Sequence, residues 1–234
     1  MKPTRLVLFD IDGTILTTHR KAWEFPFSDA IREVLDIPLT DIKTRAGGKT
    51  DPQIVHEILA DSGLSEAQID AALPAIREHY LARIRVALKD PKDVELKPGI
   101  RAAIAALQAR PEVVLGLLTG NFEEGARIKL GVHDLNGPFP FGAFGDDAKE
   151  RVMLPPKALT AAEKYTGIRF SGKDAVIIGD TPNDILCGRP LNIRTIAVAT
   201  GPYKLGELRM EKPDFLFETL EDSGKLVEAV LSEI

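Results

Sequence analysis

The chain of 234 residues contains 44% hydrophobic and 28% charged residues, the balance of a soluble globular protein with one large domain or a main domain carrying an insertion. Its formal charge is −5 and it has no basic run, so binding to nucleic acid is not expected. One cysteine, Cys187, excludes an internal disulfide and favours a reducing, cytoplasmic compartment. The first apolar run is too short for a signal peptide or membrane span, so no membrane partner is expected.

Short apolar runs alternate with helical patterns along most of the chain. The runs resemble strands buried on both faces of a parallel sheet and cover residues 6–9, 113–118, 175–178, 195–198 and 215–217. Helices are predicted at residues 100–110, 123–130, 157–166 and about 220–233. This alternation predicts an α/β fold with a Rossmann-like, doubly wound parallel sheet.

Residues 17–95 break the alternation. They carry amphipathic helical patterns near 29–35, 53–61 and 66–88, without a convincing strand, and Pro74 is expected to kink or split the longest helix. We therefore predict a catalytic core domain of residues 1–16 and 96–234 with an inserted all-helical cap domain of residues 17–95.

Acidic and hydroxyl side chains follow the predicted strands, where ligands bind in open α/β sheets. These strand-end residues are Asp10, Asp12, Thr119, Asn121, Asp180 and Asp184. Two carboxylates about 4 Å apart repel by roughly 4 kcal/mol at an effective dielectric of about 20, so several at one edge need protons or a cation. Oxygen ligands favour a hard cation, and Mg²⁺ fits best.

Three stretches, in this order, resemble motifs of the haloacid dehalogenase superfamily, closest to its phosphoglycolate-phosphatase-like branch. They are residues 10–14 (Asp-Ile-Asp-Gly-Thr), Thr119 after an apolar strand, and residues 179–184 (Gly-Asp-Thr-Pro-Asn-Asp). The resemblance spans nearly the whole chain, including the helical insertion. It implies a magnesium-dependent phosphatase that hydrolyses small phosphate monoesters through an aspartyl-phosphate, with phosphoglycolate as the default substrate.

The same resemblance implies roles for the acids. Asp10 would be the nucleophile, and Asp12 would be the general acid and then the general base. Asp180 would hold Mg²⁺ beside Asp10, and Asp184 would orient metal-bound water or a nearby cation. Asp12 would also lend a backbone carbonyl to the metal. The predicted metal-binding residues are therefore Asp10, Asp12, Asp180 and Asp184.

Further residues would bind the phosphate. Thr119 and the backbone amides of Gly120 and Asn121 would contact the phosphoryl oxygens. Gly13 would let the first motif turn so that both aspartates face the pocket, and Thr14 would form a hydrogen bond within that turn.

The family's third motif is a lysine or arginine that pairs with the phosphate and the nucleophile. The Lys-Pro pair that usually carries it is missing here, which leaves Lys149, Arg151 and Lys157 as candidates. Arg151 is favoured because it lies several residues before the predicted helix, whereas Lys157 lies within it. A guanidinium also binds phosphate through two donors at once.

The cap contains a flexible polar stretch, residues 47–51 (Gly-Gly-Lys-Thr-Asp), which faces the active site in the branch that it resembles. Lys49, with Arg45 nearby, is a candidate to bind the non-reacting end of the substrate, and solvated surface cations are the alternative. In that arrangement the cap is a lid that excludes water and sets specificity.

The partner expected from this reading is a small phosphorylated metabolite, and the chain could be a monomer or a homodimer. Asp12 argues against a dehalogenase and a phosphonate hydrolase, because both replace this acid. A phosphomutase uses the same two aspartates and remains the nearest alternative. A non-catalytic binding module with an acidic pocket is an alternative from another class.

Overall fold

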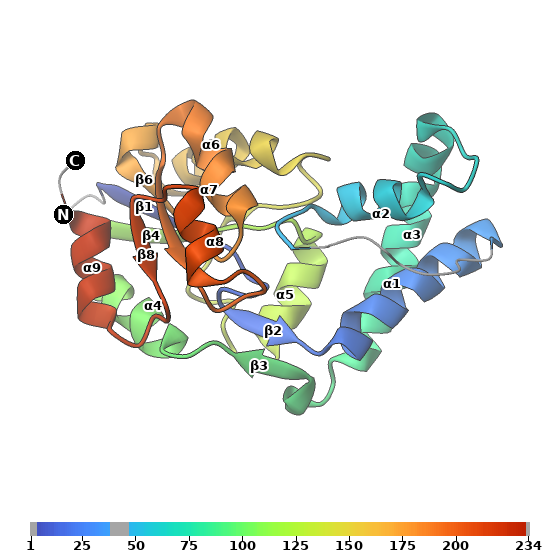
Figure 1. The fold of residues 1–234 in the computed structure, drawn as a ribbon, viewed down its shortest axis with the longest axis horizontal. Coiled ribbons are helices and arrows are strands. Elements are labelled where there is room, and N and C mark those ends of the chain that lie inside the picture. Colours follow the sequence, from blue (N-terminus) through green and yellow to red (C-terminus); the bar gives the residue numbers. More distant parts are fainter. Residues whose placement is uncertain (1–3, 38–46, 233–234) are drawn as a thin grey trace.

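The computed structural model describes residues 4–37 and 47–232, without the side chains of residues 20–23 and 25. At the centre of these residues lies a six-stranded parallel sheet with the order β5-β4-β1-β6-β7-β8 (Figure 1). Its strands are β1 (Arg5–Phe9), β4 (Val113–Leu118), β5 (Gly142–Ala143), β6 (Ala175–Gly179), β7 (Arg194–Val198) and β8 (Phe215–Phe217). The predicted doubly wound α/β fold is thereby confirmed.

Helices cover both faces of the sheet, because successive side chains of each buried strand point to opposite faces. Val7 and Phe9 of β1 belong to a core shared with α4 (Ile100–Gln108), α5 (Glu123–Gly131) and α9 (Ser223–Leu231). Leu6 and Leu8 pack on the other face with α6 (Leu154–Thr166) and α7 (Pro182–Gly188). A short helix, α8 (Leu205–Met210), packs near β8.

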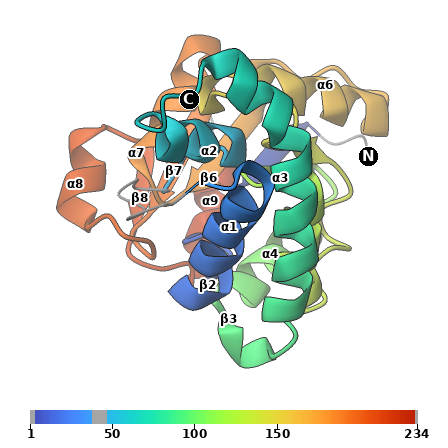
Figure 2. The same ribbon diagram turned by 90° about the vertical axis from the view of Figure 1, so that its right-hand side faces the viewer.

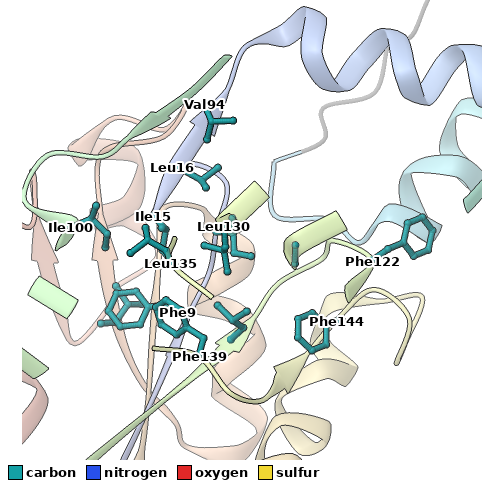
Figure 3. Packing of buried hydrophobic residues seen from close by; sticks show 14 of the residues in the cluster. Phe9, Ile15, Leu16, Val94, Ile100, Phe122, Leu130, Leu135, Phe139 and Phe144 are labelled. Carbon is teal, nitrogen blue, oxygen red and sulfur yellow. The ribbon is translucent and has the colours of Figure 1, made fainter. Parts of the chain in front are cut away.

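Aromatic and aliphatic side chains fill the core beneath β1. Figure 3 shows Phe9 beside Phe139, whose ring centroids lie 5.6 Å apart in an edge-to-face arrangement. Leu130 of α5 belongs to the same buried cluster. Rings at this separation attract each other beyond the free energy of burying their surface. This packing fixes the position of β1, whose carboxyl end carries the first motif.

Three helices form the inserted segment: α1 (Arg20–Leu35), α2 (Asp51–Leu59) and α3 (Glu66–Ala87). Figure 1 shows them together on one side of the sheet domain, and Figure 2 views the molecule from that side, with these helices in front of the sheet. Two short strands, β2 (Leu16–Thr18) and β3 (Val94–Leu96), pair antiparallel at the base of this cap, with Leu16 opposite Leu96. The expectation of no strand within residues 17–95 was therefore wrong, and the proposed domain boundaries fall inside this ribbon.

Local sequence signals begin the cap helices. The Thr50 side chain accepts a hydrogen bond from the Gln53 amide at the start of α2, and Ser65 and Gln68 form a capping box at the start of α3. Pro74 was predicted to kink or split the longest helix. The split is wrong, because α3 runs through Pro74 as one helix, and the kink stays a prediction. Pro74 is exposed, so water can satisfy the carbonyl that loses its amide partner. No helix in residues 4–37 and 47–232 is long and apolar enough to cross a membrane.

Candidate active site

A cavity of about 440 Å³ lies where the cap meets the carboxyl ends of the central strands. Most of the residues predicted from the sequence to form the site line it. They are Asp10, Asp12, Gly13, Lys49, Thr119, Gly120, Asn121 and Arg151. Arg45, the remaining cation predicted to bind substrate, lies outside the described residues.

Three buried carboxylates that follow two strand ends meet beside this cavity, and Asp10 lines it. Asp10, Asp180 and Asp184 each offer one carboxylate oxygen, and these oxygens lie within 4.8 Å of one another. Thr14 Oγ1 donates a hydrogen bond to Asp180 Oδ1 over 3.0 Å. Asp184 Oδ2 accepts from the Thr181 amide and hydroxyl over 2.9 and 2.6 Å, because these residues form the capping box that begins α7.

The cation beside the acids is Arg151, at the beginning of the short 3₁₀ turn before α6. Its Nη2 lies 2.9 Å from Asp10 Oδ1, contacts Asp184 Oδ1, and donates to the Leu118 carbonyl over 3.1 Å. The two competing lysines lie elsewhere. Lys149 Nζ is 3.1 Å from His56 Nδ1, and Lys157 is exposed on α6.

Burial dominates the electrostatics of the cluster. It raises the pKa of Asp10 to about 7, even though Arg151 acts in the opposite direction. Burial, together with the charges of Asp10 and Asp184, also raises the pKa of Asp180 well above its usual value. Further positive charge next to these acids would favour their ionised forms.

The cluster fits a hard divalent cation. Asp180 Oδ2 is buried and has no hydrogen-bond partner among the described residues, so it is available as a metal ligand. The cluster offers carboxylate oxygens alone, the donors that Mg²⁺ prefers. Gly13, at φ +93°, maintains the space, because a Cβ there would lie 2.3 Å from Asp180 Oδ2.

Asp12 is held by a different set of groups. Its carboxylate accepts from Lys129 Nζ over 2.9 and 2.7 Å and from Asn121 Nδ2 over 2.7 Å. The Asn121 amide group also donates to Thr119 Oγ1 over 2.8 Å. The side chain of Asp12 therefore lies outside the group of three acids. The contact predicted between the metal and the backbone carbonyl of Asp12 stays a prediction.

Sequence reasoning missed Lys129. The residues that α5 buries include Ala126, Lys129 and Leu130, so the lysine occurs at helical spacing within an otherwise apolar face. A charged residue at such a position needs a buried partner. The helical spacing could have indicated that Lys129 is buried, but the sequence does not indicate which acid pairs with it.

The polar stretch of the cap lies directly on the core loop that follows β4. The Asp51 amide donates to the Gly120 carbonyl over 2.7 Å, and Asp51 Oδ2 accepts from the Phe122 amide over 2.8 Å. A Cβ on Gly120 would lie 1.9 Å from the Lys49 carbonyl, so this approach requires glycine. Lys49 Nζ forms an ion pair with Glu57 of α2. The cap thus contacts the core beside the cavity, and Lys49 and Asp51 line it.

The fold and the site define a class: a Rossmann-like α/β protein with a capped acidic site at the strand ends. A family model described as haloacid dehalogenase-like hydrolase matches residues 4–192, and the chain belongs to this family.

Relatives of similar length share a low level of sequence identity with the chain. It is 25% identical to a phosphoglycolate phosphatase of Aquifex aeolicus, over 96% of this chain and 97% of the relative. It is 22% identical to the pyrophosphatase PpaX of Oceanobacillus iheyensis, over 93% of this chain and 94% of that one. The solved structure of a hydrolase from Pseudomonas syringae matches with a TM-score of 0.68 at 20% identity, covering 97% of this chain and 99% of that one, which supports the fold.

Proposed function

We propose that this hydrolase is a magnesium-dependent phosphatase that cleaves small phosphate monoesters with Asp10 as the nucleophile. The observation that carries the proposal is the cluster of Asp10, Asp180 and Asp184, with Arg151 bound to Asp10 beneath a capped cavity. Relatives named as phosphoglycolate phosphatase and pyrophosphatase favour a phosphoryl substrate. Phosphoglycolate is the default substrate.

Asp10 and Asp180 would hold the magnesium ion, and Asp184 would support it through bound water or Arg151. The ion would supply positive charge that offsets the repulsion between the nucleophilic carboxylate and the phosphate. Two observations support this assignment: Asp180 Oδ2 has no hydrogen-bond partner in residues 4–37 and 47–232, and the pKa of Asp10 is raised.

The proposed reaction has two displacements at phosphorus. In the first, an Asp10 carboxylate oxygen attacks the phosphoryl group, the bond to the ester oxygen breaks, and Asp12 donates a proton to the departing alcohol. In the second, Asp12 removes a proton from water, which attacks the phosphorus of the aspartyl-phosphate. Inorganic phosphate leaves, and the Asp10 carboxylate is regenerated.

Other residues would stabilise the transferring group and exclude water. Arg151, the Thr119 hydroxyl and the amides of Gly120 and Asn121 would bind the phosphoryl oxygens, where negative charge is concentrated in the transition state. Lys49 and Arg45 would bind the far end of the substrate, and the ion pair of Lys49 with Glu57 would fix the position of Lys49 in the cap. Closure of the cap over the cavity would keep bulk water from the reaction.

Phosphate release from para-nitrophenyl phosphate and from a panel of phosphorylated metabolites tests the proposal. We expect turnover with Mg²⁺, its loss after chelation with EDTA, and a fall of at least about 10³-fold in Asp10→Asn, which keeps the shape of the side chain but removes the nucleophile. The exposed-site variant Asp61→Asn is the matched control and should retain activity.

Two results would contradict the proposal. One is undiminished phosphate release by Asp10→Asn. The other is isomerisation of a sugar phosphate without release of phosphate, which would identify a phosphomutase instead.

A further inference from the structure

Lys129 is a buried cation that the mechanism above leaves without a role. It lies on α5 and is only 4% exposed, among the apolar residues that this helix packs against the core. A buried charge costs free energy unless it is paired, and an apolar side chain of similar length would fill the same space at a lower desolvation cost. The groups that Lys129 contacts should therefore explain why a charge stands there.

Within the described part of the chain, the hydrogen bonds of Lys129 all go to residues of the site. Its ammonium nitrogen lies 2.9 Å from Asp12 Oδ1, 2.7 Å from Asp12 Oδ2 and 2.6 Å from Asn121 Oδ1. An ammonium group has three donors: one faces the Asp12 carboxylate, whose two oxygens share it, and a second faces Asn121 Oδ1. Each is a charge-assisted or short hydrogen bond of the kind that fixes side-chain geometry.

The Asp12 carboxylate is consequently fixed at both oxygens. Lys129 contacts both, and Asn121 Nδ2 donates a further hydrogen bond to Oδ2. Thr119 Oγ1 accepts from the same amide nitrogen and so orients Asn121. The Asp12 side chain remains 40% exposed and lines the cavity, where it can meet a substrate.

We propose that Lys129, acting with the Asn121 side chain, is a positioning residue that holds the Asp12 carboxylate in place for proton transfer to the leaving oxygen. This inference rests on the proposed function, because it assigns Asp12 the role of general acid. It extends that function, because Lys129 and Asn121 would hold Asp12 independently of the cluster of Asp10, Asp180 and Asp184.

The inference predicts a dependence on the leaving group. An alkyl alkoxide is a poor leaving group and needs the proton that Asp12 supplies, whereas para-nitrophenolate leaves readily without one. Misplacing Asp12 should therefore slow the cleavage of an alkyl phosphate far more than that of para-nitrophenyl phosphate. A loss of fold or of phosphate binding would affect both substrates alike.

The test compares Lys129→Met with the matched control Lys157→Met, which removes an exposed lysine from α6. For Lys129→Met we expect kcat with an alkyl phosphate such as phosphoglycolate or glycerol phosphate to fall about 10- to 100-fold. We expect a much smaller fall with para-nitrophenyl phosphate and little change in KM for either. In the Asp12→Asn background, Lys129→Met should cause no further loss.

An equal fall with both substrates, or no fall with either, would overturn the inference. If Lys129→Met does not fold, Asn121→Ala serves for the same comparison, because it removes one hydrogen bond to Asp12 and retains the lysine. Failure of the wild-type protein to release phosphate from either ester would instead overturn the proposed function itself. The two failures are therefore distinguishable.

Discussion

At the scale of single residues, Arg151 joins two acids that come from different strand ends. Its guanidinium contacts both Asp10 and Asp184, and all three side chains are at most 6% exposed. Removing one partner of a buried ion pair leaves uncompensated charge in the interior. The acids on either side of Arg151 therefore depend on it for stability as well as for any catalytic role.

Replacing the guanidinium tests this dependence. Without Mg²⁺, Arg151→Met should lower the free energy of unfolding by about 3 to 5 kcal/mol, because it leaves two buried carboxylates without their cation. Urea unfolding at neutral pH measures the change. The control Lys157→Met should change stability by less than about 0.5 kcal/mol. A stability equal to that of the wild type would show that the ion pairs contribute no net stability.

The acids and their cation differ in how well the sequence predicts them. Asp10, Asp180 and Thr119 follow apolar strands, so local sequence and the geometry of parallel sheets are enough to bring them to one edge. Arg151 needed the resemblance as well, because its loop has no regular pattern. The Lys129 contact depends on how α5 packs against the first motif, which the local sequence does not encode.

At the scale of structural elements, the first residue of α2 connects the cap to the core through hydrogen bonds. Asp51 is the first residue of α2 and accepts a hydrogen bond from the Phe122 amide in the core. Burial raises the pKa of Asp51 to about 7, and the charge of Lys129 acts in the opposite direction. The contact therefore couples cap docking to the protonation of one carboxyl group.

This coupling predicts a pH dependence of stability. A raised folded-state pKa means that the native state holds more protons than the unfolded chain between about pH 4 and pH 7, so the free energy of unfolding falls as pH rises through this window. The full shift corresponds to at most about 4 kcal/mol. Asp51→Asn should remove this component, so its stability should fall less than that of the wild type between about pH 5 and pH 8.

Chemical unfolding at several pH values measures the free energy of unfolding of the wild type and of Asp51→Asn as a function of pH. Asp61→Asn, at an exposed turn after α2, is the control and should follow the wild type. Parallel curves for Asp51→Asn and the wild type would exclude Asp51 as the titrating group.

The elements themselves differ in how far they could be predicted. Helices α2 and α3 have strong capping residues and amphipathic patterns, so the sequence located them closely. The ribbon of β2 and β3 was missed, because each strand has only three residues and its partner lies at the far end of the insertion. This pairing forms only when the two ends of the inserted segment come together, and it does not follow from the strand propensity of either short stretch.

At the scale of the whole molecule, the fold places the acidic edge of the sheet next to the helical cap. The sheet domain supplies the acids and Arg151. The cap supplies Lys49 and Asp51, which line the cavity, and the Asp51 amide binds the core at the Gly120 carbonyl. The alternation of β1, β4, β6, β7 and β8 with helices was predictable from the apolar runs, whereas the two-residue strand β5 was not predicted. The docking of the cap was not, because it depends on side chains from segments far apart in the chain.

A crystal structure grown with Mg²⁺ and beryllium fluoride, which mimics a phosphoryl group on a carboxylate, tests the central claim most directly. The account predicts beryllium bonded to an Asp10 oxygen, with one metal ion in contact with Asp10 and Asp180 and with Arg151 bound to the fluorides. A metal ion bound away from Asp180, or beryllium fluoride attached to any residue other than Asp10, would contradict it.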